Sequence, residues 1–511
     1  MPNNVDFSGR PFHFIGIGGI GMSALAYVLA KRDLPVSGSD IHSSHITQRL
    51  QSVGAHIFGG QEATNLEFFQ PTTNKIWEAL PAAAIGTSNS QESPLEEAQT
   101  VHAKYVRDRA ASASPNVGLL PQVICSTAIN TANAEYKAAL DRGCPIFHRS
   151  DLLAALIEDY QSIAVAGTHG KTTTSSMIGY MLLNAGLDPT IVVGGEVNAW
   201  GGNARLGQSP YLVAEADESD GSLVKLSAAI GVVTNIELDH PDHYASLEQV
   251  INTFNIFALR CKTVVGCIDC SVVRDRLKPT ISYSLQRDTG ADYTVDEVNY
   301  GPFGTEARVW ERGKILGKLK LKLLGKHNLS NALAAVAVGR ILNVDFEAIA
   351  SSIATFEGAR RRFELKGESN GILFVDDYAH HPSEIRATLA AARLQVQEPR
   401  RLVAIFQPHR YSRTLTFLRE FAESFNDADI VVLSDIYSAG EPNLGEITGE
   451  RVAELIGLHH PKVHYQPSLQ AVGKCLTEIL RPGDLALFLG AGNLNQIIPS
   501  VMASHQTSQE K

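Results

Sequence analysis

The sequence predicts an α/β protein with three domains, each built on a mainly parallel sheet. The chain has 511 residues, and at roughly 150 residues per domain this length corresponds to about three domains. Short apolar runs alternate with helical patterns along most of the chain, which is typical of parallel sheets covered by helices. A strand leads into a helix near Gly16, Gly167 and Ile372. We therefore expect one α/β unit to begin at each of these points.

The predicted strands are short apolar runs that precede turns or helical patterns. They cover residues 12–17, 163–166, 191–193, 211–214, 230–234, 372–375, 402–406, 430–433 and 485–489. Residues 293–323 alternate around Val309 and Trp310, which predicts an antiparallel strand pair within the second domain. No short-period repeat is visible, so a solenoid is not expected.

The predicted domains span residues 1–157, 158–356 and 357–511. Residues 71–121 are rich in Ala, Ser, Pro and Asn, a composition that supplies little apolar surface for packing. We interpret this segment as an insertion in the first domain, with at most one short helix around residues 95–107. The polar tail 504–511 is expected to fray.

Composition excludes some classes of partner. The chain has 44 basic and 54 acidic side chains, a formal net charge of -10, which argues against a dedicated nucleic-acid binder. The N-terminus is polar, and no run of about 18 apolar residues follows that could span a membrane. Six cysteines are too few for a disulfide scaffold and suit a reducing compartment. We expect a cytoplasmic protein, a monomer or homodimer, that acts on small molecules.

The first glycine motif predicts a diphosphate site. Gly16, Gly18 and Gly21 form a G-x-G-x-x-G pattern between an apolar run and a helical one, and Asp40 follows later. A helix N-terminus presents free N–H groups to a pyrophosphate, and the acid can bind a sugar hydroxyl. The motif does not say which nucleotide binds. The alternative is a tight turn whose glycines serve only helix packing.

The second glycine motif predicts a phosphate loop. Residues 163–166 are apolar and lead into Gly167-Thr-His-Gly170-Lys171-Thr172. In such loops the backbone N–H groups hold phosphates, the lysine reaches the β and γ oxygens, and the hydroxyl ligates magnesium. The spacing departs from Walker A, because Val165 stands five residues before Gly170.

Two polar clusters follow strands of the same unit. Glu215, Asp217, Glu218 and Asp220 come after 211–214, and residues 235–243 after 230–234 include Asn235, Glu237, Asp239, His240, Asp242 and His243. Since the carboxyl ends of parallel strands line one crevice, both clusters should face the phosphate loop and help to hold Mg²⁺. The alternative is a pair of solvated loops. Residues 326–335 likewise fit either a nucleotide contact or a capped alanine-rich helix.

Taken together, the motifs resemble a known family. Residues 167–173, 234–240, 325–332, 361–363 and 376–382 resemble, in order, the motifs of the ATP-dependent Mur ligases of peptidoglycan synthesis. The resemblance covers nearly the whole chain. It implies an N-terminal Rossmann-like domain, a central P-loop ATPase-like domain and a C-terminal Rossmann-like domain. The segment 71–121 is longer than the family's first domain requires.

Further motifs resemble one branch of the family. Residues 16–23, 377–384 and 406–413 are similar to those of the ligases that add L-alanine to UDP-N-acetylmuramate. The D-N-P-R signature of the diaminopimelate- and lysine-adding siblings is absent. Those siblings also carry a carbamylated lysine beyond the metal-binding histidine, yet no lysine stands between Lys225 and Lys262.

The resemblance implies a two-step reaction with ATP and Mg²⁺, with two ions expected. The muramate carboxylate attacks the γ-phosphate to give an acyl phosphate, and the L-alanine amine then displaces phosphate to form an amide. Phosphoryl transfer needs mainly positioning and charge neutralisation. The resemblance gives catalytic roles to Lys171, His240, Arg362 and Asp377.

Binding roles follow from the same resemblance. The implied ATP-binding residues are Gly167, Thr168, His169, Gly170, Lys171, Thr172, Thr173, Asn235, Asn328 and Asn331. The implied UDP-sugar-binding residues are Gly16, Gly18, Gly19, Gly21, Met22, Ser23 and Asp40. Thr172 and Glu215 would hold one Mg²⁺ and His240 the second. Tyr378, His380, Arg410 and Arg413 would surround the muramate carboxylate and the incoming alanine.

Three alternatives stay open at this point. The first glycine motif with Asp40 would suffice for an NAD-dependent dehydrogenase, which leaves the second phosphate loop unexplained. A related ligase could join UDP-N-acetylmuramate to a recycled murein tripeptide. A non-catalytic nucleotide-binding scaffold is the third.

Overall fold

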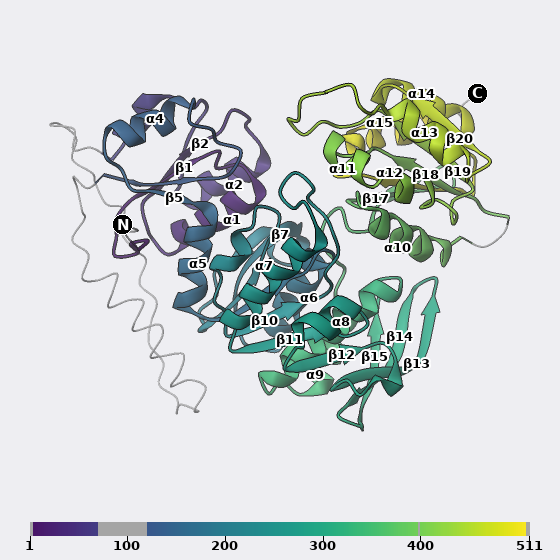
Figure 1. The fold of residues 1–511 in the computed structure, drawn as a ribbon, viewed down its shortest axis with the longest axis horizontal. Coiled ribbons are helices and arrows are strands. Elements are labelled where there is room, and N and C mark those ends of the chain that lie inside the picture. Colours follow the sequence, from purple (N-terminus) through teal and green to yellow (C-terminus); the bar gives the residue numbers. More distant parts are fainter. Residues whose placement is uncertain (1–3, 70–119, 397–398, 507–511) are drawn as a thin grey trace.

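The computed structural model describes residues 4–69, 120–396 and 399–506. Nearly all of the predicted insertion 71–121, with its expected helix at 95–107, lies outside the described residues. Figure 1 shows three α/β bodies in chain order, the first in purple and blue, the second in teal and the third in green and yellow. Each body is built on one sheet.

The N-terminal sheet has five parallel strands in the order β3-β2-β1-β4-β5. Its order reverses between β1 and β4, and ligands of such sheets bind at the reversal, beyond the carboxyl ends of the strands. The strands are β1 (Phe12–Ile15), β2 (Val36–Ser39), β3 (His56–Phe58), β4 (Gln122–Cys125) and β5 (Ile146–His148). The helices are α1 (Ile20–Lys31), α2 (His45–Ser52), α4 (Ala134–Asp141) and α5 (Arg149–Asp159).

The central sheet has ten strands in the order β15-β14-β13-β12-β11-β10-β6-β9-β7-β8. Strands β13 to β15 and the edge strand β8 are antiparallel to their neighbours, apart from the parallel pairing of β13 with β12. The strands are β6 (Gln161–Ala166), β7 (Thr190–Val197), β8 (Gly202–Arg205), β9 (Tyr211–Glu215), β10 (Ile230–Val233), β11 (Thr263–Cys267), β12 (Ile281–Ser284), β13 (Tyr293–Gly301), β14 (Gly304–Glu311) and β15 (Lys314–Leu321).

The antiparallel pairing predicted at 293–323 is confirmed, but the prediction of two strands is wrong, because the structure has three antiparallel strands there. The second turn of this meander is short. Arg312 and Gly313 both have positive φ, 46° and 81°, which is the backbone of a type I′ hairpin turn. The apolar alternation continues past that turn into β15. A single strand expected from the sequence is therefore two strands, β14 and β15, in the structure.

Helices cover both faces of the central sheet. They are α6 (Lys171–Asn184), α7 (Leu247–Arg260), α8 (Lys326–Ile341) and α9 (Phe346–Thr355). On one face, α6, α8 and α9 pack in a common apolar core. On the other face, α7 shares an apolar core with α1 of the N-terminal domain. The first two domains are therefore joined by buried apolar contacts, which fixes the two glycine loops relative to each other.

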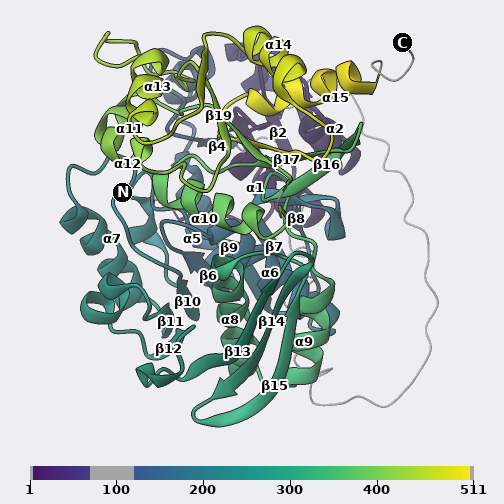
Figure 2. The same cartoon turned by 90° about the vertical axis from the view of Figure 1, so that its right-hand side faces the viewer.

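The C-terminal sheet has six strands in the order β16-β17-β21-β18-β19-β20, parallel except for the edge strand β16. The strands are β16 (Glu364–Ser369), β17 (Ile372–Asp377), β18 (Leu402–Phe406), β19 (Ile430–Ser434), β20 (Val463–Gln466) and β21 (Leu485–Leu489). The helices are α10 (Pro382–Arg393), α11 (Tyr411–Thr416), α12 (Leu418–Ala422), α13 (Gly449–Gly457), α14 (Leu469–Ile479) and α15 (Ile498–Gln506). Figure 2 shows α10 between this sheet and the central domain.

Two smaller observations concern the ends of elements. Residues 504–506 continue α15, and His505 is buried, so the fraying expected from residue 504 is wrong for this part of the tail. Within the described residues, the helices are all too short or too polar to cross a lipid bilayer.

Candidate active site

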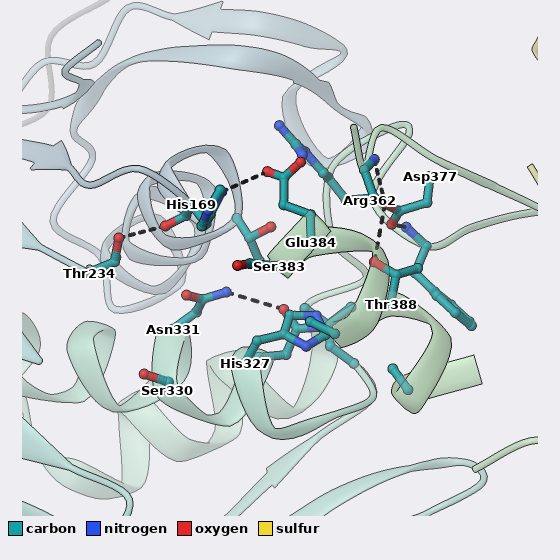
Figure 3. A pocket seen from close by; sticks show the side chains of 18 of the residues that line it. His169, Thr234, His327, Ser330, Asn331, Arg362, Asp377, Ser383, Glu384 and Thr388 are labelled. Atoms are coloured by element: carbon teal, nitrogen blue, oxygen red, sulfur yellow. Dashed lines mark hydrogen bonds and ion pairs between the residues drawn. The ribbon is translucent and has the colours of Figure 1, made fainter. Parts of the chain in front are cut away.

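Among the described residues, two cavities border the phosphate loop. The larger, about 950 Å³, is lined by all three domains, including Gly21 and Met22 of α1, Lys171 of α6 and Arg413 of α11. The smaller, about 240 Å³, lies between α8 and α10 and is shown in Figure 3. Residues from both glycine motifs therefore face one large cavity, and the phosphate loop reaches both.

The phosphate loop joins β6 to α6, and its backbone requires glycine. Gly167 and Gly170 have φ of 139° and 82°, a region that side chains rarely adopt. A Cβ on Gly167 would collide with Thr234, and one on Gly170 would lie 2.7 Å from Asn331 Oδ1. The loop is also pinned from β10, because the His169 amide donates to Asn235 Oδ1 at 2.8 Å. The sequence pattern therefore predicts where the loop lies, and contacts with Thr234, Asn235 and Asn331 stabilise its conformation.

Lys171 is paired with Glu218, a carboxylate of the cluster after β9 that the sequence predicts to face the phosphate loop. Its Nζ donates to Glu218 Oε2 at 2.8 Å and to Gly167 O at 2.8 Å. Burial disfavours the charged lysine, but Glu218 and the neighbouring Asp217 raise its pKa above the ordinary value. Burial also raises the pKa of Glu218, to about 7, against the attraction of Lys171. The Lys171 ammonium group is thus paired with Glu218, at the position where a phosphate would be expected to bind.

The predicted magnesium ligands lie on two sides of Lys171. Thr172 Oγ1 donates to Glu215 Oε1 at 3.0 Å, and the Gly194 amide donates to Glu215 Oε2 at 2.6 Å. His240 Nε2 lies 3.8 Å from Glu218 Oε1. Burial lowers the pKa of His240, which keeps the imidazole neutral as metal ligation requires. A hydroxyl, carboxylates and one imidazole at a phosphate loop fit Mg²⁺ with ATP.

Arg362 and Asp377 connect the C-terminal domain to the phosphate loop. Arg362 Nη2 donates to Thr172 Oγ1 at 3.4 Å. Asp377 accepts from the amides of Phe363 and Ala379 at 2.7 and 2.8 Å. Burial raises the pKa of Asp377 to about 6, although the Arg362 charge lowers it. In this conformation Asp377 holds the backbone that presents Arg362, at the edge of the smaller cavity.

The predicted substrate arginines pair with acids of the central domain. Arg413 Nε donates to Asp239 Oδ1 at 2.8 Å, and both side chains are at most 5% exposed. Arg413 Nη2 lies 3.5 Å from His240 Nδ1. Arg410 donates to Asp242 Oδ2 at 3.1 Å. The polar cluster after β10 therefore faces α11 as well as the phosphate loop.

Tyr378 and His380 follow β17 and line the large cavity. His380 Nδ1 lies 2.9 Å from the Tyr378 carbonyl oxygen and 3.2 Å from Glu384 Oε2. These two acceptors favour the tautomer with the proton on Nδ1. Burial lowers the pKa of His380 to about 4, so the ring is neutral at pH 7. Its Nε2 lone pair is then available to accept a proton.

The smaller cavity has one wall from each of two domains. Asn328 and Asn331 of α8 form one wall, and Ser383, Glu384 and Thr388 of α10 form another. Figure 3 shows Asn331 of α8 across this space from Ser383 and Glu384 of α10. Asn328 Nδ2 donates to the Leu324 carbonyl at 2.8 Å, and Asn331 Nδ2 donates to Asn328 Oδ1 at 3.3 Å. The open space beside the phosphate loop suits the base and ribose of a nucleotide.

In the first glycine loop, Asp40 binds the backbone of the loop itself. The Gly18 amide donates to Asp40 Oδ2 at 2.8 Å, and the amides of Gly16 and Ile17 donate to Ser39 O. Gly19, Gly21 and Met22 line the large cavity. Ser23 instead accepts from Asn203 Nδ2 at 2.9 Å in the contact between the first two domains. Asp40 is thus a loop-holding residue here, and its sugar contact stays a prediction.

Sequence reasoning missed Arg149 beside this loop. It begins α5, directly after the parallel strand β5. Its Nη2 donates to Asp217 Oδ2 at 3.0 Å and to Asp220 Oδ2 at 3.4 Å. The side chain lies beside Gly21 and lines the large cavity. Its position at the carboxyl end of a parallel strand is the signal that could have found it.

Three family models match consecutive parts of the chain. Residues 11–161 match "Mur ligase family, catalytic domain", residues 165–339 match "Mur ligase middle domain", and residues 361–492 match "Mur ligase, glutamate ligase domain". The chain belongs to the Mur ligase family. The resemblance stated from the motifs is confirmed, and so is the three-domain α/β fold class.

The chain is also similar to individual Mur ligases of known name. The chain is 69% identical over 504 residues, 99% of its length and 98% of the relative's, to UDP-N-acetylmuramate–L-alanine ligase of Nostoc punctiforme. It is 64% identical to the protein of the same name from Trichormus variabilis, over 99% of this chain and 98% of that one. The crystal structure of UDP-N-acetylmuramate-alanine ligase from Thermotoga maritima has a TM-score of 0.75 and 26% identity, covering 98% of this chain and 100% of that one.

Proposed function

We propose that this Mur ligase joins L-alanine to the carboxylate of UDP-N-acetylmuramate, with ATP converted to ADP and phosphate. The observation that carries the proposal is the large cavity, which is lined at once by the first glycine loop, the phosphate loop and the basic residues of the C-terminal domain. A ligase with three substrates needs this convergence. The choice of UDP-N-acetylmuramate and L-alanine as substrates rests on the names of the relatives at 69% and 64% identity.

In the first step the muramate carboxylate oxygen attacks the γ-phosphorus, and the bond from the γ-phosphorus to the β,γ-bridging oxygen breaks. ADP departs, and the muramate carboxylate becomes an acyl phosphate. Lys171 exchanges Glu218 for the phosphate oxygens and neutralises their charge. Arg362, already hydrogen-bonded to Thr172, adds a second positive charge. Two magnesium ions, one held by Thr172 and Glu215 and one by His240, would supply further neutralisation of the phosphates.

In the second step the alanine nitrogen attacks the acyl carbon, the carbon–oxygen bond to phosphate breaks, and the amine loses a proton. His380 is the candidate to accept that proton, because it lines the large cavity and its Nδ1 faces two acceptors, which leaves Nε2 as the atom that takes the proton. Arg410, Arg413 and Tyr378 would orient the reacting carboxylate and the amino acid. We propose Gly16, Gly18, Gly19, Gly21, Met22, Ser23 and Asp40 as the UDP-sugar site, of which Gly19, Gly21 and Met22 line the cavity.

The nucleotide lies, in this proposal, across both cavities. Its phosphates meet Gly167, Gly170 and Lys171, and its base and ribose enter the space between α8 and α10 beside Asn328 and Asn331. Thr168, His169, Thr173 and Asn235 shape the loop between these two ends. Arg362 and Asp377 of the C-terminal domain line the smaller cavity in this structure and would contact the nucleotide there.

The same proposal includes the organisation of the protein. The proposed boundary at 356/357 falls in the connection between α9, which ends at Thr355, and β16. The proposed boundary at 157/158 cuts the last turn of α5, which ends at Asp159 just before β6 begins at Gln161. We place the reaction in the cytoplasm, where ATP and nucleotide sugars are made, and expect a monomer or a homodimer.

A phosphate-release assay tests the function. Release should require ATP, UDP-N-acetylmuramate and L-alanine together, and mass spectrometry should show the amide product. Release with a murein tripeptide but not with L-alanine would identify the tripeptide ligase instead. Nicotinamide reduction without phosphate release would identify a dehydrogenase, and binding without turnover would identify a scaffold.

A further inference from the structure

Three side chains that carry no distinct role in the proposed reaction chemistry meet at the boundary between two domains. His169 belongs to the phosphate loop, Glu237 follows β10, and His381 precedes α10 of the C-terminal domain. Among the described residues, each of the three offers one atom within 4.8 Å of the other two. The imidazole rings of His169 and His381 lie 4.7 Å apart. Two imidazoles and one carboxylate are a donor set that zinc prefers.

The spacing of the donor atoms is close to that of a tetrahedral site. His169 Nε2 lies 3.3 Å from Glu237 Oε2, and His381 Nδ1 lies 4.0 Å from the same oxygen. Bonds of about 2.1 Å in a tetrahedron separate neighbouring ligand atoms by about 3.4 Å. Small side-chain rotations would therefore suffice to bring the three atoms around one ion.

The surroundings of the three donors are those of a supported metal site. His169 Nδ1 faces Glu384 Oε1 at 3.2 Å, an arrangement that orients metal-ligating imidazoles in proteins. Ser383 Oγ donates to Glu237 Oε2 at 2.7 Å. Figure 3 shows the dashed contact from His169 to Glu384 beside Ser383. His169 and Glu237 are thus already held in place by groups outside the donor set.

The electrostatics favour a cation here. Burial alone would lower the pKa of His169, but the carboxylates of Glu237 and Glu384 raise it to about 10. A positive charge is therefore stable between these two acids. Burial lowers the pKa of His381 to about 4, so its imidazole is neutral at pH 7 and keeps a lone pair.

We propose that His169 Nε2, Glu237 Oε2 and His381 Nδ1 bind one divalent transition-metal ion of the zinc class. The site is separate from the proposed magnesium ligands, and its nitrogen donors select against Mg²⁺. Binding releases the Nε2 proton of His169 to solvent, while Nδ1–H still donates to Glu384. The ion also takes the His381 lone pair that accepts a long bond of 3.3 Å from the Ser383 amide.

An ion at this site has two consequences. It ties the phosphate loop of the central domain to the first turn of α10, and so fixes the C-terminal domain. His169 and Glu237 also line the smaller cavity, so the ion and a nucleotide compete for that space. The competition rests on the proposed function, whereas metal binding by itself does not.

The test uses the full chain, stripped of metals and kept in millimolar Mg²⁺ to occupy the oxygen-rich site. Co²⁺ titration should give the intense visible bands of a tetrahedral ion at one equivalent, and Zn²⁺ should displace them. His381→Ala and Glu237→Gln should each weaken Zn²⁺ binding by about tenfold or more. His464→Ala, which removes an exposed imidazole of β20, is the matched control and should leave the affinity unchanged.

Zn²⁺ affinity that is equal in the parent, His381→Ala and Glu237→Gln would overturn the site, as would the absence of one-equivalent binding. Circular dichroism checks the fold of each variant. If His381→Ala fails to fold, Glu237→Gln decides, because it changes one atom of a side chain that is 43% exposed. A separate titration of an ATP analogue with and without Zn²⁺ tests the competition. Loss of competition with metal binding intact would count against the nucleotide assignment of the smaller cavity and leave the metal site standing.

Discussion

The two glycine loops of this protein share a backbone arrangement and differ in the charges around it. Both join a parallel strand to a helix, β1 to α1 and β6 to α6, and both helix N-termini open into the large cavity. The first loop has its Gly18 amide bound to Asp40. The second carries Lys171, which is surrounded by the acids that follow β9.

We infer from this difference that glycine spacing predicts an anion site, whereas the neighbouring charges decide which anion binds. Arg149 lies beside the first loop, where we propose that the unreacting diphosphate of the UDP-sugar binds. Lys171, Arg362, Thr172 and Glu215 lie at the second loop, where we propose that charge develops during phosphoryl transfer. We therefore expect chemistry at the second loop and substrate binding at the first.

The largest expected effect is on catalysis at the second loop. Lys171→Ala should lower kcat about 100-fold or more, because the phosphates lose a buried positive charge. Stopped assays of phosphate release measure the rate, and circular dichroism confirms folding. Lys474→Ala, on α14, is a control that should keep the parent rate. A Lys171→Ala enzyme with more than half of the parent rate would contradict the assignment of the loop.

The second-largest expected effect is the loss of activity when proposed magnesium ligands at the same loop are removed. Glu215→Ala and His240→Ala should each lower activity by about tenfold to 100-fold, and at least one should recover in part at high Mg²⁺, because two ions share the phosphate charge. Mg²⁺ titrations of the initial rate measure this. Unchanged Mg²⁺ dependence in both variants would mean that these residues do not hold the ions.

At the first loop the expected effect is on binding of the UDP-sugar. A Cβ on Gly18 would lie 2.7 Å from Asp40 Oδ2 and 3.2 Å from Thr47 Cγ2, so Gly18→Ala should move Asp40 and raise KM for UDP-N-acetylmuramate about tenfold. KM for ATP should stay within a factor of two or so. Gly59→Ala is the matched control, because its Cβ would meet nothing within 4 Å. An equal rise in both KM values would show that the loops are not separate sites.

The smallest expected effect concerns stability, since the second loop alone is tied to the C-terminal domain through His169. Its pKa, raised to about 10 by Glu237 and Glu384 despite burial, lies above the ordinary value. The stabilisation is therefore fully present below about pH 6.5 and lost as pH rises through 10. Glu384→Gln should lower Tm by a few degrees at pH 7, with a difference that shrinks toward pH 10.

Thermal unfolding of both proteins from pH 6 to 10 measures this difference. Glu454→Gln removes the exposed partner of Arg451 on α13, and its small effect should not vary over that range. A Glu384→Gln difference that stays constant from pH 7 to 10 would show that the His169 charge does not contribute.

Much of the fold was predictable from local pattern, because buried parallel strands are short apolar runs and each glycine loop lies between a strand and a helix. The third strand of the meander was not, because Arg312 is an unusual residue for a turn with positive φ. Catalytic candidates in the second domain were predictable from strand ends. Glu218 was expected to face the phosphate loop as a possible Mg²⁺ ligand, but its ion pair with Lys171 is visible only in the folded chain. Glu384 received no role, because only the folded chain shows that it faces His169.

Calorimetry on three proteins tests the central claim that the two loops hold different nucleotides. The parent, saturated with a non-hydrolysable ATP analogue, should bind UDP-N-acetylmuramate with Kd between about 1 µM and the low millimolar range, roughly -8 to -4 kcal/mol, and NAD far more weakly. Gly18→Ala should lose most of this affinity and keep that for the ATP analogue, and Lys171→Ala should do the reverse. If either variant lost both ligands, or if NAD bound more tightly than the UDP-sugar, the account of two distinct sites would be contradicted.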